Sequence, residues 1–165
     1  LRINDLLIGI ESSGLHSNGF TKVREIFQKE YKSEFIKPTN IYLDTILKID
    51  SRYEIHGLMH ITGGGFTKLK EILCQNSDVI ITNNHKIEPQ NIFKVIYKRG
   101  VRDEQMYKTF NCGIGFVLSV EEKNADKILK EIKRDGFKAD IIGRVVKGKG
   151  RIKIQSKFSN REIRY

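Results

Sequence analysis

The chain has 165 residues, of which 39% are hydrophobic and 30% charged, with only 2 prolines; this composition excludes a disordered or fibrous protein and is typical of one globular domain. It holds no run of about 18 apolar residues and no basic-then-apolar leader, which predicts a cytoplasmic protein that has no contact with membranes. The net charge of +10 is interspersed with acidic residues, so we interpret it as a solvated surface rather than a nucleic-acid interface, although it would also attract a phosphorylated small molecule.

The predicted elements alternate between strands and helices. The apolar run over residues 5–11 predicts a strand, and apolar positions at helical spacing predict a helix over 20–31. A second helix is expected to start at Pro38-Thr39 and, with five apolar residues between Ile41 and Ile49, to be well buried. A strand over 55–61, a helix containing 66–73, a strand over 78–82 and a helix over 90–99 follow.

The rest of the chain continues this alternation. An extended run covers residues 111–120, a charged helix 121–135, and two strands about 140–146 and 152–155 are joined by Gly148-Lys149-Gly150, which suits a hairpin turn. The sequence therefore predicts one α+β domain over residues 1–165, layered α/β/α around a mixed sheet. Both cysteines, Cys74 and Cys112, lie in apolar runs and are expected to be reduced core thiols.

Two loops carry more polar chemistry than a strand-to-helix connection needs. The first runs from Ser12 to Gly19 and the second from Thr62 to Gly65. Unpaired N–H groups at a helix start and closely approaching glycines can hold a phosphate, so both loops are possible anion sites. The alternative is that Ser17 or Asn18 only caps the helix and the glycines only turn the chain. The second loop lacks the spacing of a nucleotide-binding Walker A loop.

The histidines divide by context. His16 and His60 lie in the two glycine-rich loops, and we expect both to be partly accessible and on the same side of the sheet. His56 and His60 have the spacing of a helical zinc pair, but Gly57 stands where that motif has its glutamate, so no metal site is predicted. His85, in a polar loop, is expected at the solvated surface.

Three stretches together resemble the C-terminal domain of the phosphoribosylformylglycinamidine cyclo-ligase (AIR synthetase) family: Ser12-Ser13-Gly14-Leu15-His16-Ser17-Asn18-Gly19, His56-Gly57-Leu58-Met59-His60-Ile61-Thr62-Gly63-Gly64-Gly65, and Met106-Tyr107-Lys108-Thr109-Phe110-Asn111-Cys112-Gly113-Ile114-Gly115. Pro38-Thr39-Asn40-Ile41-Tyr42 also falls where the family has Pro-Thr-Arg-Ile-Tyr, with Asn40 in place of the arginine. The resemblance covers nearly the whole chain.

The resemblance implies an ATP-dependent ring closure in purine biosynthesis. It implies that His16 and His60 are catalytic and that the substrate or its phosphate is bound by Ser13, Gly14, Ser17, Asn18, Gly19, Thr62, Gly63, Gly64, Gly65 and Asn111. ATP and Mg²⁺ would be held mainly by the family's N-terminal domain, which this chain lacks, so the chain alone is expected to be inactive. The full-length protein would be a homodimer.

Other readings stay open. The chain could belong to another ATP-using member of the wider superfamily, of the selenophosphate synthetase, hydrogenase maturation or formylglycinamidine ribonucleotide synthase type. It could also be a small RNA-binding module that uses Gly148-Lys149-Gly150-Arg151, but it has no aromatic RNP pattern and no Gly-x-x-Gly clamp. Leu1, rather than Met, shortly before a strand predicts a piece cut from a longer polypeptide.

Overall fold

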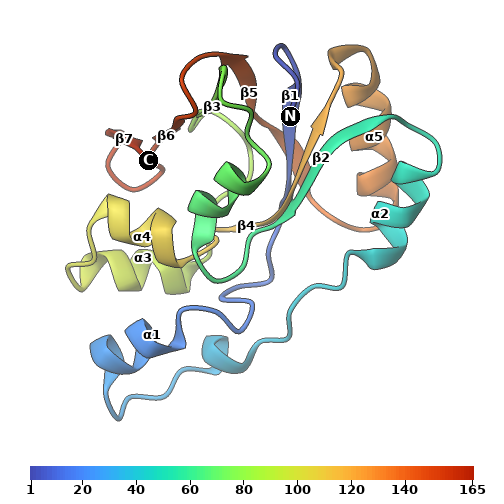
Figure 1. Ribbon diagram of the computed structural model, residues 1–165. Coiled ribbons are helices and arrows are strands. Elements are labelled where there is room, and N and C mark those ends of the chain that lie inside the picture. The colour runs from blue at the N-terminus through green and yellow to red at the C-terminus, as the bar shows by residue number, and fades with distance from the viewer.

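A seven-stranded mixed sheet forms the centre of the computed structural model, which describes all 165 residues (Figure 1). The strands are β1 (Leu6–Glu11), β2 (Ile55–His60), β3 (Ser77–Ile81), β4 (Ile114–Val120), β5 (Ala139–Lys147), β6 (Ile152–Gln155) and β7 (Glu162–Arg164). Their order in the sheet is β2-β4-β1-β5-β3-β6-β7, and all neighbours are antiparallel except β3 and β6. The predicted mixed sheet is confirmed.

Helices cover both faces of this sheet. They are α1 (Phe20–Phe27), α2 (Leu43–Asp50), α3 (Asn91–Lys98), α4 (Asp103–Thr109) and α5 (Glu122–Arg134), with 3₁₀ helices at Ser33–Ile36 and Gly65–Glu71. In Figure 1, α2 and α5 lie on one face and α3 and α4 on the other, while α1 lies beyond the strand ends. None of these helices has the length and apolar character that a membrane crossing requires.

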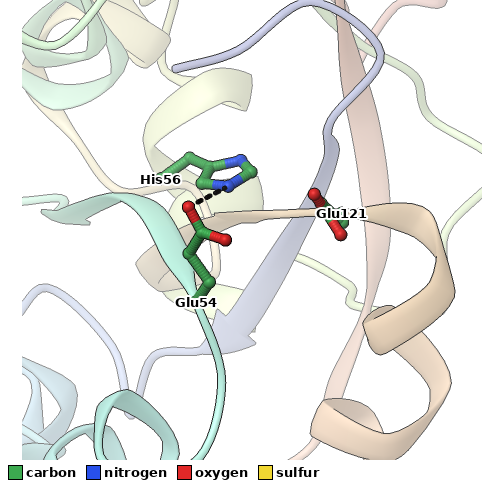
Figure 2. A group of neighbouring side chains, drawn as sticks. All are labelled: Glu54, His56 and Glu121. Carbon is green, nitrogen blue, oxygen red and sulfur yellow. Dashed lines mark ion pairs between the residues drawn. The ribbon is translucent and has the colours of Figure 1, made fainter.

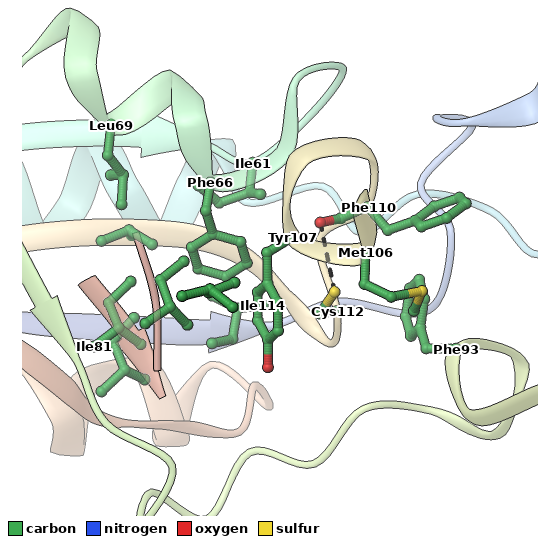
Figure 3. Close-up of a cluster of buried hydrophobic side chains, with 14 of the residues drawn as sticks. Ile61, Phe66, Leu69, Ile81, Phe93, Met106, Tyr107, Phe110, Cys112 and Ile114 are labelled. Atoms are coloured by element: carbon green, nitrogen blue, oxygen red, sulfur yellow. Dashed lines mark hydrogen bonds between the residues drawn. The ribbon is translucent and has the colours of Figure 1, made fainter. Parts of the chain in front are cut away.

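The central strand β1 supplies residues to two separate hydrophobic cores. Leu7 belongs to a cluster of 26 buried residues, part of which Figure 3 shows, whereas Leu6 and Ile8 belong to a cluster of 13 that includes α5. Successive side chains of a strand point to opposite faces, so a strand buried on both faces is apolar throughout. This arrangement confirms the layered α/β/α prediction.

The first two helices differ from their predicted bounds. α1 ends at Phe27 rather than residue 31, because Gln28 leaves the helical conformation with a positive φ of 50°. α2 begins at Leu43 rather than Pro38, since the Asn40 amide and the Tyr42 hydroxyl both donate to the Glu11 carbonyl, at 3.2 and 2.7 Å, and so tie residues 40–42 to the end of β1.

The predicted burial of this helix is wrong for three of the five apolar residues between Ile41 and Ile49. Ile46 and Ile49 are buried, but Ile41, Leu43 and Leu47 are 82%, 60% and 58% exposed. The helix and the segment just before it therefore present apolar side chains to solvent, defined here as the α2 face (Ile41, Leu43, Leu47).

The predicted hairpin between the last long strands is also wrong, because β3 lies between β5 and β6. The Asp78 carboxylate on β3 accepts the N–H groups of Lys149 and Arg151, at 2.7 and 2.9 Å, and pairs with Lys153 at 2.9 Å. Burial raises the pKa of Asp78, but these contacts outweigh it and bring the pKa to about 2. The connection thus wraps around the start of β3. Helix α4 and strand β7 were not predicted.

Both cysteines are free thiols, as predicted. Cys112 is buried and its pKa is raised by burial, which agrees with the interpretation as a core residue (Figure 3). Cys74 is exposed, so its assignment to the core is wrong.

Candidate functional site

The two glycine-rich loops meet beyond the carboxyl ends of β1 and β2. β4 pairs antiparallel with both β1 and β2, so β1 and β2 run in the same direction. The loops that follow β1 and β2 therefore leave from the same ends of the strands. The rings of His16 and His60 have centroids 6.0 Å apart, and a Cβ on Gly63 would lie 3.6 Å from Asn18 Oδ1. The expectation that the two histidines lie on the same side of the sheet is confirmed.

His16 is buried beneath its own loop. Only 3% of it is exposed, so the expected accessibility is wrong for this residue. Its Nε2 accepts the N–H of Ser13 at 2.9 Å and that of Asn40 at 3.4 Å, which draws the ring inward. Burial, and then the nearby His60, lower the pKa of His16 to about 4. A neutral ring that accepts at Nε2 carries its proton on Nδ1, and Nδ1 is buried without a partner.

His60 lies at the end of β2 and is partly exposed, as expected. Its ring stacks on Phe116 (centroids 5.7 Å apart, planes at 24°) and meets the edge of Tyr42 at 5.7 Å. Burial, and then the charge of Lys68, lower the pKa of His60, so the ring is neutral at pH 7. Its Nε2 has no hydrogen-bond partner. The sequence gives no signal that places Phe116 at the site, and Tyr42 is marked only by its place in the Pro38-Thr39-Asn40-Ile41-Tyr42 motif.

The third motif, Met106 to Gly115, supports both loops. Asn111 is buried; its Oδ1 accepts from Ser12 Oγ and from the Gly113 N–H, both at 2.9 Å, and its Nδ2 donates to the Gly14 carbonyl at 2.7 Å. Asn111 therefore positions the first loop.

Three glycines of the site, Gly19, Gly65 and Gly115, are packed too closely for any side chain. A Cβ on Gly19 would overlap the Phe110 ring, one on Gly65 the Tyr107 carbonyl, and one on Gly115 the Tyr42 hydroxyl. Phe110 and Tyr107 belong to the third motif and appear in Figure 3. The motif thus packs against the two loops and fixes their separation.

The start of α1 is not capped by a side chain, against the alternative that Ser17 or Asn18 serves as a cap. Gly19 precedes the first helical residue and has φ of 71°. Asn18 Nδ2 donates to the His16 carbonyl at 2.6 Å, and Ser17 is exposed. The first N–H groups of α1 thus have no side-chain acceptor and carry the positive end of the helix dipole. In the second loop, Lys68 Nζ donates to Thr62 Oγ1 at 3.2 Å.

Several hollows of the surface lie away from the two loops. One of about 700 Å³ is lined by Lys70, Leu73, Gln75, Asn76, Gly148, Lys149 and Gly150. The two loops line neither this hollow nor four others on the surface. His85 lies apart from the loops and is only 6% exposed, so its expected surface position is wrong; burial lowers its pKa to about 4.

The fold and the paired loops define a layered α/β/α domain with uncapped N–H groups and glycines at one sheet edge, an arrangement suited to an anionic ligand. Residues 2–155 match the family model described as "AIR synthase related protein, C-terminal domain", and the chain belongs to this family. Phosphoribosylformylglycinamidine cyclo-ligases of Clostridium perfringens and Clostridium novyi are 40% and 41% identical over 157 and 152 residues. These matches cover 90% and 87% of this chain but 47% and 46% of the relatives, so the chain spans about half their length.

Solved structures with the same fold are more distant in sequence. Escherichia coli HypE has a TM-score of 0.70 at 20% identity, covering 100% of this chain and 50% of HypE. A HypE in complex with ATP has a TM-score of 0.65 at 16% identity, covering 99% of this chain and 50% of that HypE. Thermotoga maritima PurL complexed with FGAR has a TM-score of 0.61 at 10% identity, covering 98% and 27%. At these identities the likeness is one of fold.

Proposed function

We propose that this chain is the C-terminal half of an ATP-dependent cyclo-ligase that converts phosphoribosylformylglycinamidine to aminoimidazole ribonucleotide in de novo purine biosynthesis, in the cytoplasm. The observation that carries the proposal is the 40% identity to cyclo-ligases over 90% of the chain. The structural neighbours HypE and PurL, at 20% identity or less, support the fold but give no comparable argument for their own reactions.

The reaction needs positioning and hydrogen-bond donors more than covalent catalysis by the protein. The formyl oxygen of the substrate is phosphorylated, and an amidine nitrogen then displaces phosphate as the ring closes. Such steps are accelerated by groups aimed at developing negative charge. The N–H groups around Gly14, Gly19 and Gly63–Gly65, with the hydroxyl of Ser17, hold the phosphorylated substrate.

The two histidines take different roles in this proposal. His60, partly exposed and neutral, faces the reacting centre. His16 acts indirectly from beneath the first loop, since its Nε2 accepts the Ser13 N–H. This hydrogen bond holds the loop backbone in the conformation that receives the anion. Asn111 likewise acts by holding Gly14.

ATP supplies the phosphoryl group, and its magnesium ion requires oxygen ligands, mostly carboxylates. Neither loop contains Asp or Glu, so these residues suit a phosphate but not the metal. The N-terminal half of the protein therefore holds Mg²⁺ and most of the nucleotide. The structure of HypE in complex with ATP supports nucleotide use among proteins of this fold.

The N-terminal half is also the proposed partner of the surface formed by the two glycine-rich loops. That surface supplies one wall of a cleft between the two halves. The exposed α2 face (Ile41, Leu43, Leu47) supports an interface with another part of the full-length protein. Neighbouring large apolar side chains that are exposed in one domain usually mark a surface that another domain or protein contacts. The full-length protein is proposed to be a homodimer.

The proposal predicts that the chain alone forms no aminoimidazole ribonucleotide and that activity returns when the N-terminal half is supplied. The test mixes this chain with the N-terminal half of the Clostridium perfringens relative and measures ATP-dependent product formation. His60→Ala in the mixture should lower turnover at least tenfold with little change in melting temperature. Turnover by the chain alone, or full turnover in the His60→Ala mixture, would contradict the proposal; sequencing the DNA upstream gives an independent check.

A further inference from the structure

A second group of ligand-type side chains lies at the opposite end of β2 from His60. Glu54 precedes the strand, His56 lies on it, and Glu121 joins β4 to α5 (Figure 2). A strand advances about 3.3 Å per residue, so His56 and His60 are roughly 13 Å apart and cannot share a metal ion. This group is therefore independent of the glycine-rich loops.

The orientation of His56 is fixed by a buried carboxylate. Its side chain is only 2% exposed, and its Nδ1 lies 2.8 and 3.0 Å from the two oxygens of Asp5. Asp5 Oδ2 also accepts from Ser119 Oγ at 2.6 Å and from the Arg2 N–H at 3.0 Å. Because a carboxylate in these contacts only accepts, the proton of a neutral His56 ring lies on Nδ1, and Nε2 presents a lone pair.

The Nε2 atom of His56 is buried and has no hydrogen-bond partner. Its nearest carboxylate oxygen, Glu54 Oε1, is 3.5 Å away, and one oxygen of Glu121 completes a set of three atoms that all lie within 4.8 Å of one another. A lone pair that faces carboxylates at this distance is stabilised only by a cation between them. We propose that Glu54, His56 and Glu121 bind a divalent transition-metal ion of the zinc type.

The donor set indicates this class of ion. One imidazole with two carboxylates suits zinc and its first-row neighbours, whose bonds to nitrogen and oxygen are about 2.0–2.2 Å, whereas magnesium and calcium prefer oxygen ligands alone. Three protein ligands leave a position for water. Asp5 is the outer-shell carboxylate that commonly fixes the tautomer of a ligating histidine.

Two basic side chains neutralise the carboxylates in the absence of the ion. Arg2 lies 2.8 Å from Glu54 and Lys123 lies 2.5 Å from Glu121. Both basic side chains are exposed, by 61% and 76%, and exposed ion pairs of this kind are weak, so a metal ion can displace them. Removing this competition with Arg2→Gln should therefore raise the affinity for zinc.

The test is a calorimetric titration of the chain with zinc chloride in a Cys74→Ser background, because the exposed Cys74 thiol would itself bind zinc. We expect one ion per chain and at least a tenfold loss of affinity in His56→Gln and in Glu121→Gln. Glu122→Gln is the matched control, since it removes the same charge one residue away at an exposed position outside the group, and it should bind as the parent does. Circular dichroism confirms that each variant is folded.

Three results would overturn the proposal. One is undiminished binding in both His56→Gln and Glu121→Gln; another is an equal loss in Glu121→Gln and Glu122→Gln, which indicates general attraction between charges. The third is no binding at all, with NMR signals of His56 that show protons on both ring nitrogens, because the cation between the groups is then a proton. None of these results bears on the cyclo-ligase proposal, since the two sites share no residue.

Discussion

His16 is the residue whose protonation should most directly disturb the site. A proton on Nε2 would place a donor against the N–H of Ser13. The folded-state pKa of about 4 lies below the ordinary value of 6.5, so stability from this residue is fully present above pH 6.5 and is lost as the pH falls towards 4. His16→Gln should flatten the decline in unfolding free energy over this window by up to about 1.4 kcal/mol per pH unit.

Urea unfolding at several pH values between 7.5 and 4.5 measures this slope for both proteins. His85, whose pKa is also lowered to about 4, remains in both and contributes equally to each. Identical slopes for the parent and His16→Gln would show that the ring titrates as it does in the unfolded chain, and the assigned role of Nε2 would be wrong.

At the scale of elements, the triple-glycine loop should tolerate a side chain at one glycine and not at another. Gly65 has φ of 54°, and its Cβ would overlap the backbone carbonyl of Tyr107 on α4, so Gly65→Ala should lower the free energy of unfolding by at least about 2 kcal/mol. Gly63→Ala, whose Cβ has only Asn18 Oδ1 within 4 Å, should change it by less than about 0.5 kcal/mol. Urea unfolding of the pair compares the two positions; equal effects would show that the loop is not packed against α4.

The first loop is predicted to bind an anion through its backbone. Titration with inorganic phosphate should shift the amide NMR signals of residues 14–19, because the start of α1 has N–H groups without a side-chain acceptor. Helix-end interactions are worth only about 0.3–2 kcal/mol each, so binding by this half alone is expected at millimolar phosphate. Shifts elsewhere, with residues 14–19 unmoved, would mean that the loop is only a turn.

Helix α2 should show two kinds of apolar residue. Ile49 is fully buried, so Ile49→Ala should lower the free energy of unfolding by about 2–5 kcal/mol. Leu47 is 58% exposed, so Leu47→Ala should lower it by less than about 1 kcal/mol. Leu47→Ala should instead weaken association with the N-terminal half in the reconstitution described above. A loss of stability as large as that of Ile49→Ala would show that the α2 face is covered within this chain.

Sequence patterns predict elements well where periodicity is strong and fail where contacts between distant segments decide. The charged helix α5 has a regular apolar stripe and lies where expected, whereas α4 has only Met106, Tyr107 and one buried aspartate facing inward and gives no such signal. The glycines after β5 suit a hairpin by themselves, and only the contacts of Asp78, some 70 residues earlier, show that the chain passes around β3 instead.

At the scale of the whole molecule, the candidate site is assembled from segments that are far apart in sequence. The family motifs identify the two loops and the third motif, but the burial of His16 depends on Asn40, 24 residues later, and on the close approach of Gly115. The sequence therefore predicts which residues gather, and tertiary packing determines which of them face solvent. His60 keeps its expected exposure because it lies on β2, at the edge of the sheet.

The position of β1 in the interior of the sheet, between β4 and β5, has a consequence for biosynthesis. Of the seven strands of this sheet, β1 is made first, but both of its neighbours, β4 and β5, belong to residues 114–147. At about 5–20 residues per second, an apolar segment leaves the ribosome on the order of ten seconds before its partners exist. Until then Leu6–Ile10 is available to chaperones or to other nascent chains, and His16 has no support from Asn111 or Gly115. The candidate site is therefore completed only after residues 111–116 have been made.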